Sequence, residues 1–308
     1  MSCLASSRRI TLIADDYGLA PGVSLAIRQL LSAGALSGTS CMTVGAFWPD
    51  AAGALHGLAA AAGPRVEPRI ELGLHLCLTG PFAPLSPQLR NGAGWRRFPT
   101  LAGLFRLSLG RCLPLGALSA EIEAQYAAFT DALGRPPDFI DGHQHVHLLP
   151  GIAETLGLTL QSVGARPRWI RRCGDHARRI LRRPFAAKSF FLQALSRRSD
   201  AVLGPLARRR NASFCGIYDF AARDYPALFD RWLATVPDES VVMCHPGLVD
   251  RSLAALDPVT TAREAECRYF AGPGFRHALR RHDVTLAPFG MPAEAAAEPE
   301  TPFRRGIG

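Results

Sequence analysis

The pattern that most constrains this chain is a set of short apolar segments that each run directly into acidic or histidine residues. Residues 10–14 lead into Asp15 and Asp16, and residues 139–140 lead into Asp141 and a histidine run. Segments with helical periodicity lie between them. Strands that alternate with helices predict parallel βαβ units, and a sheet of this many units commonly closes into a barrel. We therefore predict an α/β fold, a single TIM-like (β/α) barrel with its chemistry at the carboxyl ends of the strands.

The expected elements follow from hydrophobic periodicity and from helix start and stop signals. One helix begins at Pro21 and ends near Gly34, and a second spans residues 119–133 with Ser119 as its N-cap and Gly134 beyond it. The expected strands are residues 10–14, 39–44, 70–76, 139–141, 240–244 and 284–287. Acidic or histidine residues are therefore expected at the ends of four of these strands.

Length and composition indicate one intracellular domain. A chain of 308 residues with 48% hydrophobic and 20% charged residues can bury one large core. No run approaches the roughly 18 apolar residues that span a bilayer, and residues 1–9 lack the apolar core of a signal peptide. Eight cysteines without a C-x-x-C pair indicate reduced thiols in the cytoplasm rather than a disulfide framework. We expect one domain over residues 1–291 and a loosely ordered tail over 292–308.

The positive charge is concentrated in one segment. The net charge is +9, and residues 166–210, which include Arg171 and Arg183, carry 14 Arg or Lys residues against two acids. Phenylalanines and leucines are interleaved with them, which is typical of a basic amphipathic insertion, at about 172–211, that lies on an anionic membrane surface. The alternative is a solvated pair of basic helices that covers the mouth of the barrel. Nucleic-acid binding is disfavoured because charge is its only support.

A run of alternating histidines is a candidate source of metal ligands. His143, His145 and His147 follow the strand at 139–141, and on an extended segment they cannot all point the same way. One or two of them can be ligands, and a contribution of His145 or His147 stays open. The alternative is a surface or capping feature, which the acids and histidines expected at the same barrel rim disfavour.

His75 and the acid pair complete the candidate set. His75 lies among apolar residues at a strand end, where a core histidine and a ligand are equally compatible with the sequence. Asp15 and Asp16 either cap the next helix or face a cation, because buried carboxylates are costly without one. One carboxylate and two imidazoles leave open positions on a metal ion, which is typical of a catalytic site. A second carboxylate and a further histidine are then available as general base and general acid.

Four motifs, in this order, closely resemble the YdjC-like carbohydrate deacetylases, a family that includes chitooligosaccharide deacetylases and a hopanoid-biosynthesis-associated protein. The motifs are residues 14–23 (ADDYGLAPGV), 73–76 (GLHL), 141–147 (DGHQHVH) and 243–247 (MCHPG), with further similarity at 216–220 and 263–266. The resemblance spans about residues 9–289. It implies that residues 1–291 form a deacetylase domain, a barrel related to the polysaccharide deacetylase fold.

The resemblance also implies an activity and a set of residues for it. The expected enzyme is a metal-dependent hydrolase that removes an acetyl group from an N-acetylated sugar, an N-acetylglucosamine-type oligosaccharide or glycolipid, and releases acetate. On the matching positions, Asp16, His75 and His143 would bind one divalent ion, Zn²⁺ or Mg²⁺. Asp15 would act as general base and His245 as general acid.

Several alternatives stay open at this stage. Asp141 is either an orienting partner of a neighbouring imidazole or a turn residue. The whole protein is alternatively a non-catalytic, metal-containing protein that binds sugar or nucleic acid. Its expected location is the cytoplasm, with peripheral contact at the inner membrane face through the basic insertion as a variant, and a homodimer is compatible with the sequence.

Overall fold

The computed structural model of this protein describes residues 7–61, 70–221 and 224–290. Its strands form one parallel sheet in the order β5-β4-β3-β2-β1-β7-β6, with β8 paired to β1. The expected parallel α/β architecture is therefore confirmed. The strands are β1 (Arg8–Tyr17), β2 (Gly38–Cys41), β3 (Glu71–Leu76), β4 (Phe139–Gly142), β5 (Trp169–Ile170), β6 (Ser213–Cys215), β7 (Ser240–Cys244) and β8 (Val284–Leu286).

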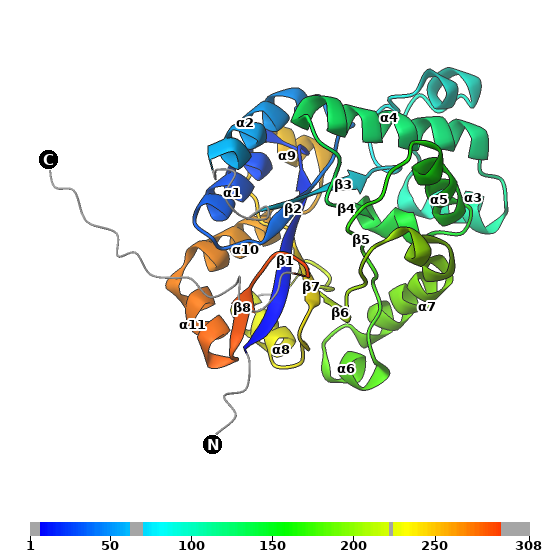
Figure 1. Ribbon diagram of the computed structural model, residues 1–308. Coiled ribbons are helices and arrows are strands. Elements are labelled where there is room, and N and C mark those ends of the chain that lie inside the picture. The colour runs from blue at the N-terminus through cyan, green and yellow to red at the C-terminus, as the bar shows by residue number, and fades with distance from the viewer. Residues whose placement is uncertain (1–6, 62–69, 222–223, 291–308) are drawn as a thin grey trace, which may run out of the picture.

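Helices surround the strands on both sides (Figure 1), with α1, α2, α10 and α11 on one side and α4, α5, α6 and α7 on the other. They are α1 (Pro21–Ser32), α2 (Trp48–Ala61), α3 (Leu101–Leu109), α4 (Leu115–Leu133), α5 (Ile152–Ser162), α6 (Ala177–Arg182), α7 (Ala186–Leu203), α8 (Tyr225–Leu233), α9 (Arg251–Leu256), α10 (Thr261–Ala271) and α11 (Pro273–Arg281). Short turns of 3₁₀- or π-helix occur at Gln88–Gly92, His143–Leu148 and Gly204–Leu206. In the part of the chain that the structure describes, no helix is both long and apolar enough to span a membrane.

The sheet is a half-barrel, so the closed TIM-like ring of our prediction is not confirmed. Among the described residues, the outer strands β5 and β6 form no ladder with each other. The buried side chain of Asn211 lies between them instead: its Oδ1 accepts from the Arg172 N–H (3.1 Å), and its Nδ2 donates to the Arg172 carbonyl (3.0 Å) and to that of Ser213 (2.9 Å). A side-chain amide can satisfy the backbone groups that a strand ladder otherwise would.

The elements expected from periodicity occur close to their predicted positions. All six predicted strands are present, and α1 begins at Pro21 as expected. The second helix, α4, begins at Leu115 rather than Ser119, so the prediction of Ser119 as N-cap was wrong; its hydroxyl bonds that of Thr159 (2.8 Å). Gly134 ends α4 with φ 65°, a conformation in which glycine carries no steric cost. The predicted tail, 292–308, lies outside the described residues.

Aromatic packing beneath the strand ends supports the site. The rings of Phe139 and Trp169 stack with centroids 4.1 Å apart, and both side chains are buried. Gly73 makes room for them, because a Cβ at that position would come within 2.3 Å of the Phe139 ring. These contacts pack β3, β4 and β5 closely against one another.

A buried carboxyl group at the start of β3 gives the fold a pH dependence. Burial raises the pKa of Glu71 to about 8, and its Oε1 accepts from Trp169 Nε1 at 3.3 Å. Because the folded-state pKa lies above the ordinary value of 4.5, the protonated form stabilises the fold at low pH. That contribution is lost as the pH rises toward and through 8.

We expect Glu71→Gln to be less sensitive to this rise in pH. The variant should lose up to about 4 kcal/mol less unfolding free energy than the wild type between pH 5 and pH 9, since a neutral amide does not ionise. Urea unfolding at both pH values measures the difference. Glu123→Gln, at an exposed position of α4, is the control and should follow the wild type. If the unfolding free energies of Glu71→Gln and the wild type change equally with pH, the raised pKa of Glu71 is contradicted.

Candidate metal and catalytic site

Polar side chains from four strands of the sheet converge on one cavity at its carboxyl end. Asp15 and Asp16 come from the end of β1, His75 from the end of β3, and His143 and His245 directly follow β4 and β7. All five line a cavity of about 490 Å³. The structure therefore brings together the five residues that the sequence predicted for the site.

A bulge at the end of β1 presents both acids to the cavity. The pairing between β1 and β2 shifts register between Ala14 and Tyr17, and Asp16 adopts φ 67°. A bulge of this kind changes the direction of a side chain next to a strand end. Asp15 and Asp16 are 2% and 1% exposed, so neither is a solvated turn residue.

Three of these side chains form a group that could hold a metal ion. Asp16 Oδ1 lies 2.8 Å from His143 Nδ1 and 3.3 Å from His75 Nε2. One ligand atom from each residue falls within 4.8 Å of the other two. Ligands about 2.1 Å from a tetrahedral ion lie roughly 3.4 Å apart, so these separations need only a small adjustment to accept one.

The partner of His75 favours the same arrangement. Its Nδ1 lies 2.6 Å from Asp141 Oδ1, which also accepts a hydrogen bond from the Ser40 hydroxyl. A carboxylate that accepts a hydrogen bond from Nδ1 orients Nε2 toward Asp16, which is the usual support of a metal-binding histidine. Burial lowers the pKa of His75, but Asp141 and Asp16 outweigh it and raise the pKa to about 10. The surroundings thus favour a positive charge at this imidazole, and the donor set fits a divalent cation.

Two buried arginines balance the carboxylates of the site. Arg171 Nη1 and Nη2 donate to the two oxygens of Asp15 (2.6 and 2.7 Å), and Nη2 also lies 2.6 Å from Asp141 Oδ2. Arg263 Nη2 donates to Asp16 Oδ2 at 2.6 Å, so the two oxygens of Asp16 face an arginine and the histidines respectively. Burial alone would raise the pKa of Asp16, but Arg263 and His143 hold it well below its usual range. Asp16 therefore stays ionised inside the protein.

His245 lies on the far side of Asp15. Its Nε2 is 3.9 Å from Asp15 Oδ2, its backbone N–H donates to Glu266 Oε2 (2.5 Å), and the Phe220 ring meets its edge at 5.0 Å. Burial lowers the pKa of His245 to about 4 despite the nearby acids, so its imidazole is neutral at pH 7. A neutral imidazole beside a carboxylate can receive a proton and release it to another group.

The histidine run is not extended, and our prediction of its local structure was wrong. Residues 143–148 form a 3₁₀ turn in which Gln144 and His145 have φ 52° and 60°. Within the described residues, neither His145 nor His147 belongs to a group with metal-ligand geometry. His147 Nε2 contacts the Arg171 carbonyl at 3.0 Å, and His145 Nδ1 contacts Cys173 Sγ at 3.5 Å.

The walls of the cavity at the carboxyl end of the sheet are largely apolar. Helix α7 and helix α3 meet at its edge, where the rings of Phe191 and Phe105 lie 5.7 Å apart. Lys188 also lines the cavity and donates to the Tyr218 carbonyl at 3.0 Å. The apolar side chains that line the cavity are Leu19, Phe82, Leu101, Phe105, Leu149, Phe191, Leu192, Leu195, Phe220, Met243, Leu256 and Val259.

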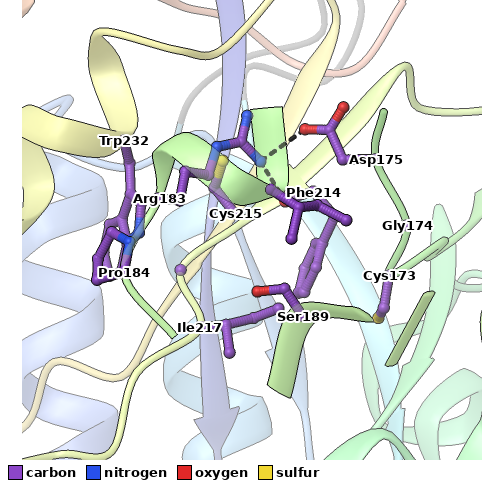
Figure 2. Close-up of a pocket in the computed structure, with 12 residues that line it drawn as sticks. Cys173, Gly174, Asp175, Arg183, Pro184, Ser189, Phe214, Cys215, Ile217 and Trp232 are labelled. Atoms are coloured by element: carbon purple, nitrogen blue, oxygen red, sulfur yellow. Dashed lines mark hydrogen bonds and ion pairs between the residues drawn. The ribbon is translucent and has the colours of Figure 1, made fainter. Parts of the chain in front are cut away.

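The basic insertion folds as a helix pair, α6 and α7, and several of its arginines face inward. Figure 2 shows Arg183 beside Asp175 and the Phe214 carbonyl, with Nη1 distances of 2.6 and 3.1 Å. The pocket drawn there holds about 10 Å³, room for one water molecule rather than a sugar. Arg171 and Arg183 are buried, so our expectation that they belong to a membrane-facing set was wrong.

Comparison with known proteins agrees with this geometry. The sequence profile of the family described as YdjC-like protein matches residues 9–281. The chain belongs to the YdjC-like protein family. It is 29% identical over 264 residues to a chitooligosaccharide deacetylase of Serratia marcescens, which covers 84% of this chain and 95% of that protein. It is also 29% identical over 256 residues to a human carbohydrate deacetylase, covering 78% of this chain and 75% of that one.

A solved structure has the same fold. A protein of Enterococcus faecalis V583, named for cellobiose-phosphate cleavage, superimposes with a TM-score of 0.69 at 19% identity. The alignment covers 95% of this YdjC-like chain and all of the other one. At this identity the similarity establishes the fold alone.

The motifs of this YdjC-like chain included the acids and histidines but left the roles of two arginines undetermined. Arg263 lies in the segment 263–266 that resembles the family, without an assigned contact, and Arg171 was part of the basic segment. The signal that could have found them is charge balance: Asp15, Asp16 and Asp141 at buried strand ends need cationic partners besides one metal ion.

Proposed function

We propose that this protein is a metal-dependent carbohydrate deacetylase that hydrolyses the acetamide of an N-acetylated sugar. The observation that carries the proposal is the convergence of Asp16, His75 and His143 beside Asp15 and His245 in one cavity. The names of the curated relatives support the reaction class. A non-catalytic binding protein is the weaker alternative, because binding alone needs neither the acid pair nor His245.

A divalent cation, when bound by Asp16, His75 and His143, would polarise the acetyl carbonyl and lower the pKa of a water molecule. One carboxylate and two imidazoles suit zinc first, and magnesium is the alternative. Arg263 fixes Asp16 through its second oxygen, and Asp141 fixes His75 through Nδ1. Two of the three proposed ligands, Asp16 and His75, are therefore oriented by side chains that do not themselves bind the metal.

The chain's own proton-transfer groups are Asp15 and His245. Arg171 holds both oxygens of Asp15, which orients the carboxylate to accept a proton from the attacking water. His245 Nε2, 3.9 Å from Asp15 Oδ2 and neutral at pH 7, is placed to receive that proton and deliver it to the departing amine nitrogen. The C–O bond to the acetyl carbon forms as the carbonyl π bond opens, and the C–N bond breaks as that π bond re-forms and the nitrogen takes the proton. Acetate and the free amine are the products.

The apolar cavity favours a substrate in which the sugar carries a lipid. A sugar alone offers mostly hydroxyl groups, whereas the walls of this cavity offer mostly hydrocarbon. Large apolar side chains also stay exposed along α3 and α7: Leu101 (36%), Leu109 (65%), Phe190 (36%) and Phe191 (51%). We propose that this rim meets the membrane surface at the inner face of the bilayer and admits a glycolipid; a soluble oligosaccharide is the second candidate, favoured by the Serratia relative.

The rim predicts binding to lipid vesicles. The double variant Leu109→Ser/Phe190→Ser should bind vesicles several-fold more weakly than the wild type, because each exposed apolar side chain contributes to insertion. Leu158→Ser, at a 68% exposed leucine of α5, is the control and should bind like the wild type. Co-sedimentation with anionic and neutral vesicles at two salt concentrations measures this. Equal binding of all three proteins, or no preference for anionic vesicles at low salt, would favour the soluble oligosaccharide.

Acetate release tests the reaction itself. The purified protein is incubated with a panel of N-acetylated glycans and glycolipids, with and without a chelator. We expect release that the chelator abolishes and added divalent metal restores. Sugar binding without acetate release from any member of the panel would support the non-catalytic alternative.

A further inference from the structure

A second cavity lies at the opposite end of two catalytic strands. It has a volume of about 450 Å³ and is lined by residues 135–138, which precede β4, by residues 164–168, which precede β5, and by Tyr126 and Arg208. It shares no lining residue with the catalytic cavity. The proposed deacetylation therefore makes no use of it.

The lining of this cavity is strongly cationic. Its lining includes one carboxylate, Asp138, and four arginines: Arg135, Arg166, Arg168 and Arg208. Asp138 is already engaged: it forms an ion pair with Arg135, and its Oδ2 accepts from the Leu72 N–H at 2.9 Å. Among the described residues, Asp138 therefore forms no ion pair with Arg166 or Arg208.

Arg166 and Arg208 have no ion-pair partner among residues 7–61, 70–221 and 224–290. Both are exposed. They come from two parts of the chain that α6 and α7 separate, and both line this cavity. A concave site lined by charges of one sign raises the local concentration of ions of the opposite sign. The arrangement therefore favours the binding of an anion.

The remaining lining residues indicate what kind of anion fits. Pro136, Pro137 and Pro167 form rigid apolar walls, and the ring of Tyr126 is half-buried beside them. Guanidinium groups bind phosphate oxygens in pairs, and an apolar wall accommodates the organic part of an ester. A cavity of this volume has room for both parts.

We propose that this cavity binds the phosphate group of an organic phosphate ester, with Arg166 and Arg208 as its main contacts. The ester is either a soluble metabolite or the headgroup of an anionic phospholipid, since both present the same phosphate chemistry. Glycerol 3-phosphate is the soluble probe, and vesicles of phosphatidylcholine with phosphatidylglycerol are the lipid probe.

The test compares two double variants of the full-length, metal-loaded protein. Arg166→Gln/Arg208→Gln removes two charges from the cavity, and Arg276→Gln/Arg280→Gln removes two from the exposed face of α11. Calorimetry with glycerol 3-phosphate should show at least tenfold weaker binding for the first double variant and unchanged binding for the second. Acetate release should be unchanged in both, because neither pair touches the catalytic cavity.

The vesicle arm identifies the source of the phosphate. Vesicle binding that weakens together with glycerol 3-phosphate binding assigns the cavity to a lipid headgroup, and unchanged vesicle binding assigns it to a soluble ester. Two results would overturn the proposal. One is that the wild type binds neither glycerol 3-phosphate nor vesicles. The other is that the two double variants bind both probes equally.

Discussion

Replacing Asp15 with asparagine is expected to lower deacetylation by roughly 10²- to 10⁴-fold, the usual contribution of a general base. An amide cannot accept the proton from water, whereas the three proposed metal ligands stay in place. The fold should also persist, because Arg171 keeps its ion pair with Asp141 at 2.6 Å. Turnover and metal content, measured on the same preparation, separate a lost base from a lost metal.

Asp131→Asn, at an exposed position of α4, is the matched control for this loss and should leave turnover unchanged. Ordinary turnover in Asp15→Asn would remove Asp15 from the mechanism. Low turnover together with low metal content would instead make Asp15 part of the metal site, a role that the group Asp15, His75 and Asp141 allows on distance alone.

Replacing Arg171 with methionine is expected to destabilise the protein by about 3–5 kcal/mol, the usual effect of removing one partner of a buried ion pair. Arg171 is 1% exposed and pairs with both Asp15 and Asp141, so its loss leaves two buried carboxylates without their main cation. Urea unfolding measures the change in unfolding free energy. The double variant Arg171→Met/Asp15→Asn should recover part of the loss, because one of the two charges is then absent.

Arg179→Met is the control for an arginine in a partly exposed ion pair. Its guanidinium lies 2.8 Å from Asp175 and is 38% exposed, so removal should cost at most about 1 kcal/mol. A loss for Arg171→Met as small as that for Arg179→Met would show that Arg171 does not balance the acids of the site.

The sequence predicted which polar residues meet at the strand ends better than it predicted the architecture around them. Asp15, Asp16, His75, His143 and His245 could be placed at strand ends because the strands before them are apolar runs of several residues. Strands β5 and β6 have only two and three residues, which is too short to show the alternating hydrophobic pattern of a strand. The open edge of the half-barrel could therefore not be predicted.

The arginine partners and the histidine turn depended on contacts between distant parts of the chain. Arg171 and Asp15 are 156 residues apart in the sequence, and Arg263 and Asp16 are 247 apart. No local sequence pattern predicts either ion pair. The run 143–147 alternates like a strand, yet it folds as a turn in which His147 contacts the Arg171 carbonyl. Tertiary contacts overrode the local pattern there.

Metal content and acetate release of His75→Ala test the central claim most directly. Elemental analysis of the purified variant is compared with the wild type and with His56→Ala, which removes an exposed histidine of α2. We expect the wild type and His56→Ala to hold one divalent ion and to release acetate from an N-acetylated sugar, and His75→Ala to lose both properties. Equal metal occupancy and equal acetate release in all three proteins would contradict the proposed site and the reaction assigned to it.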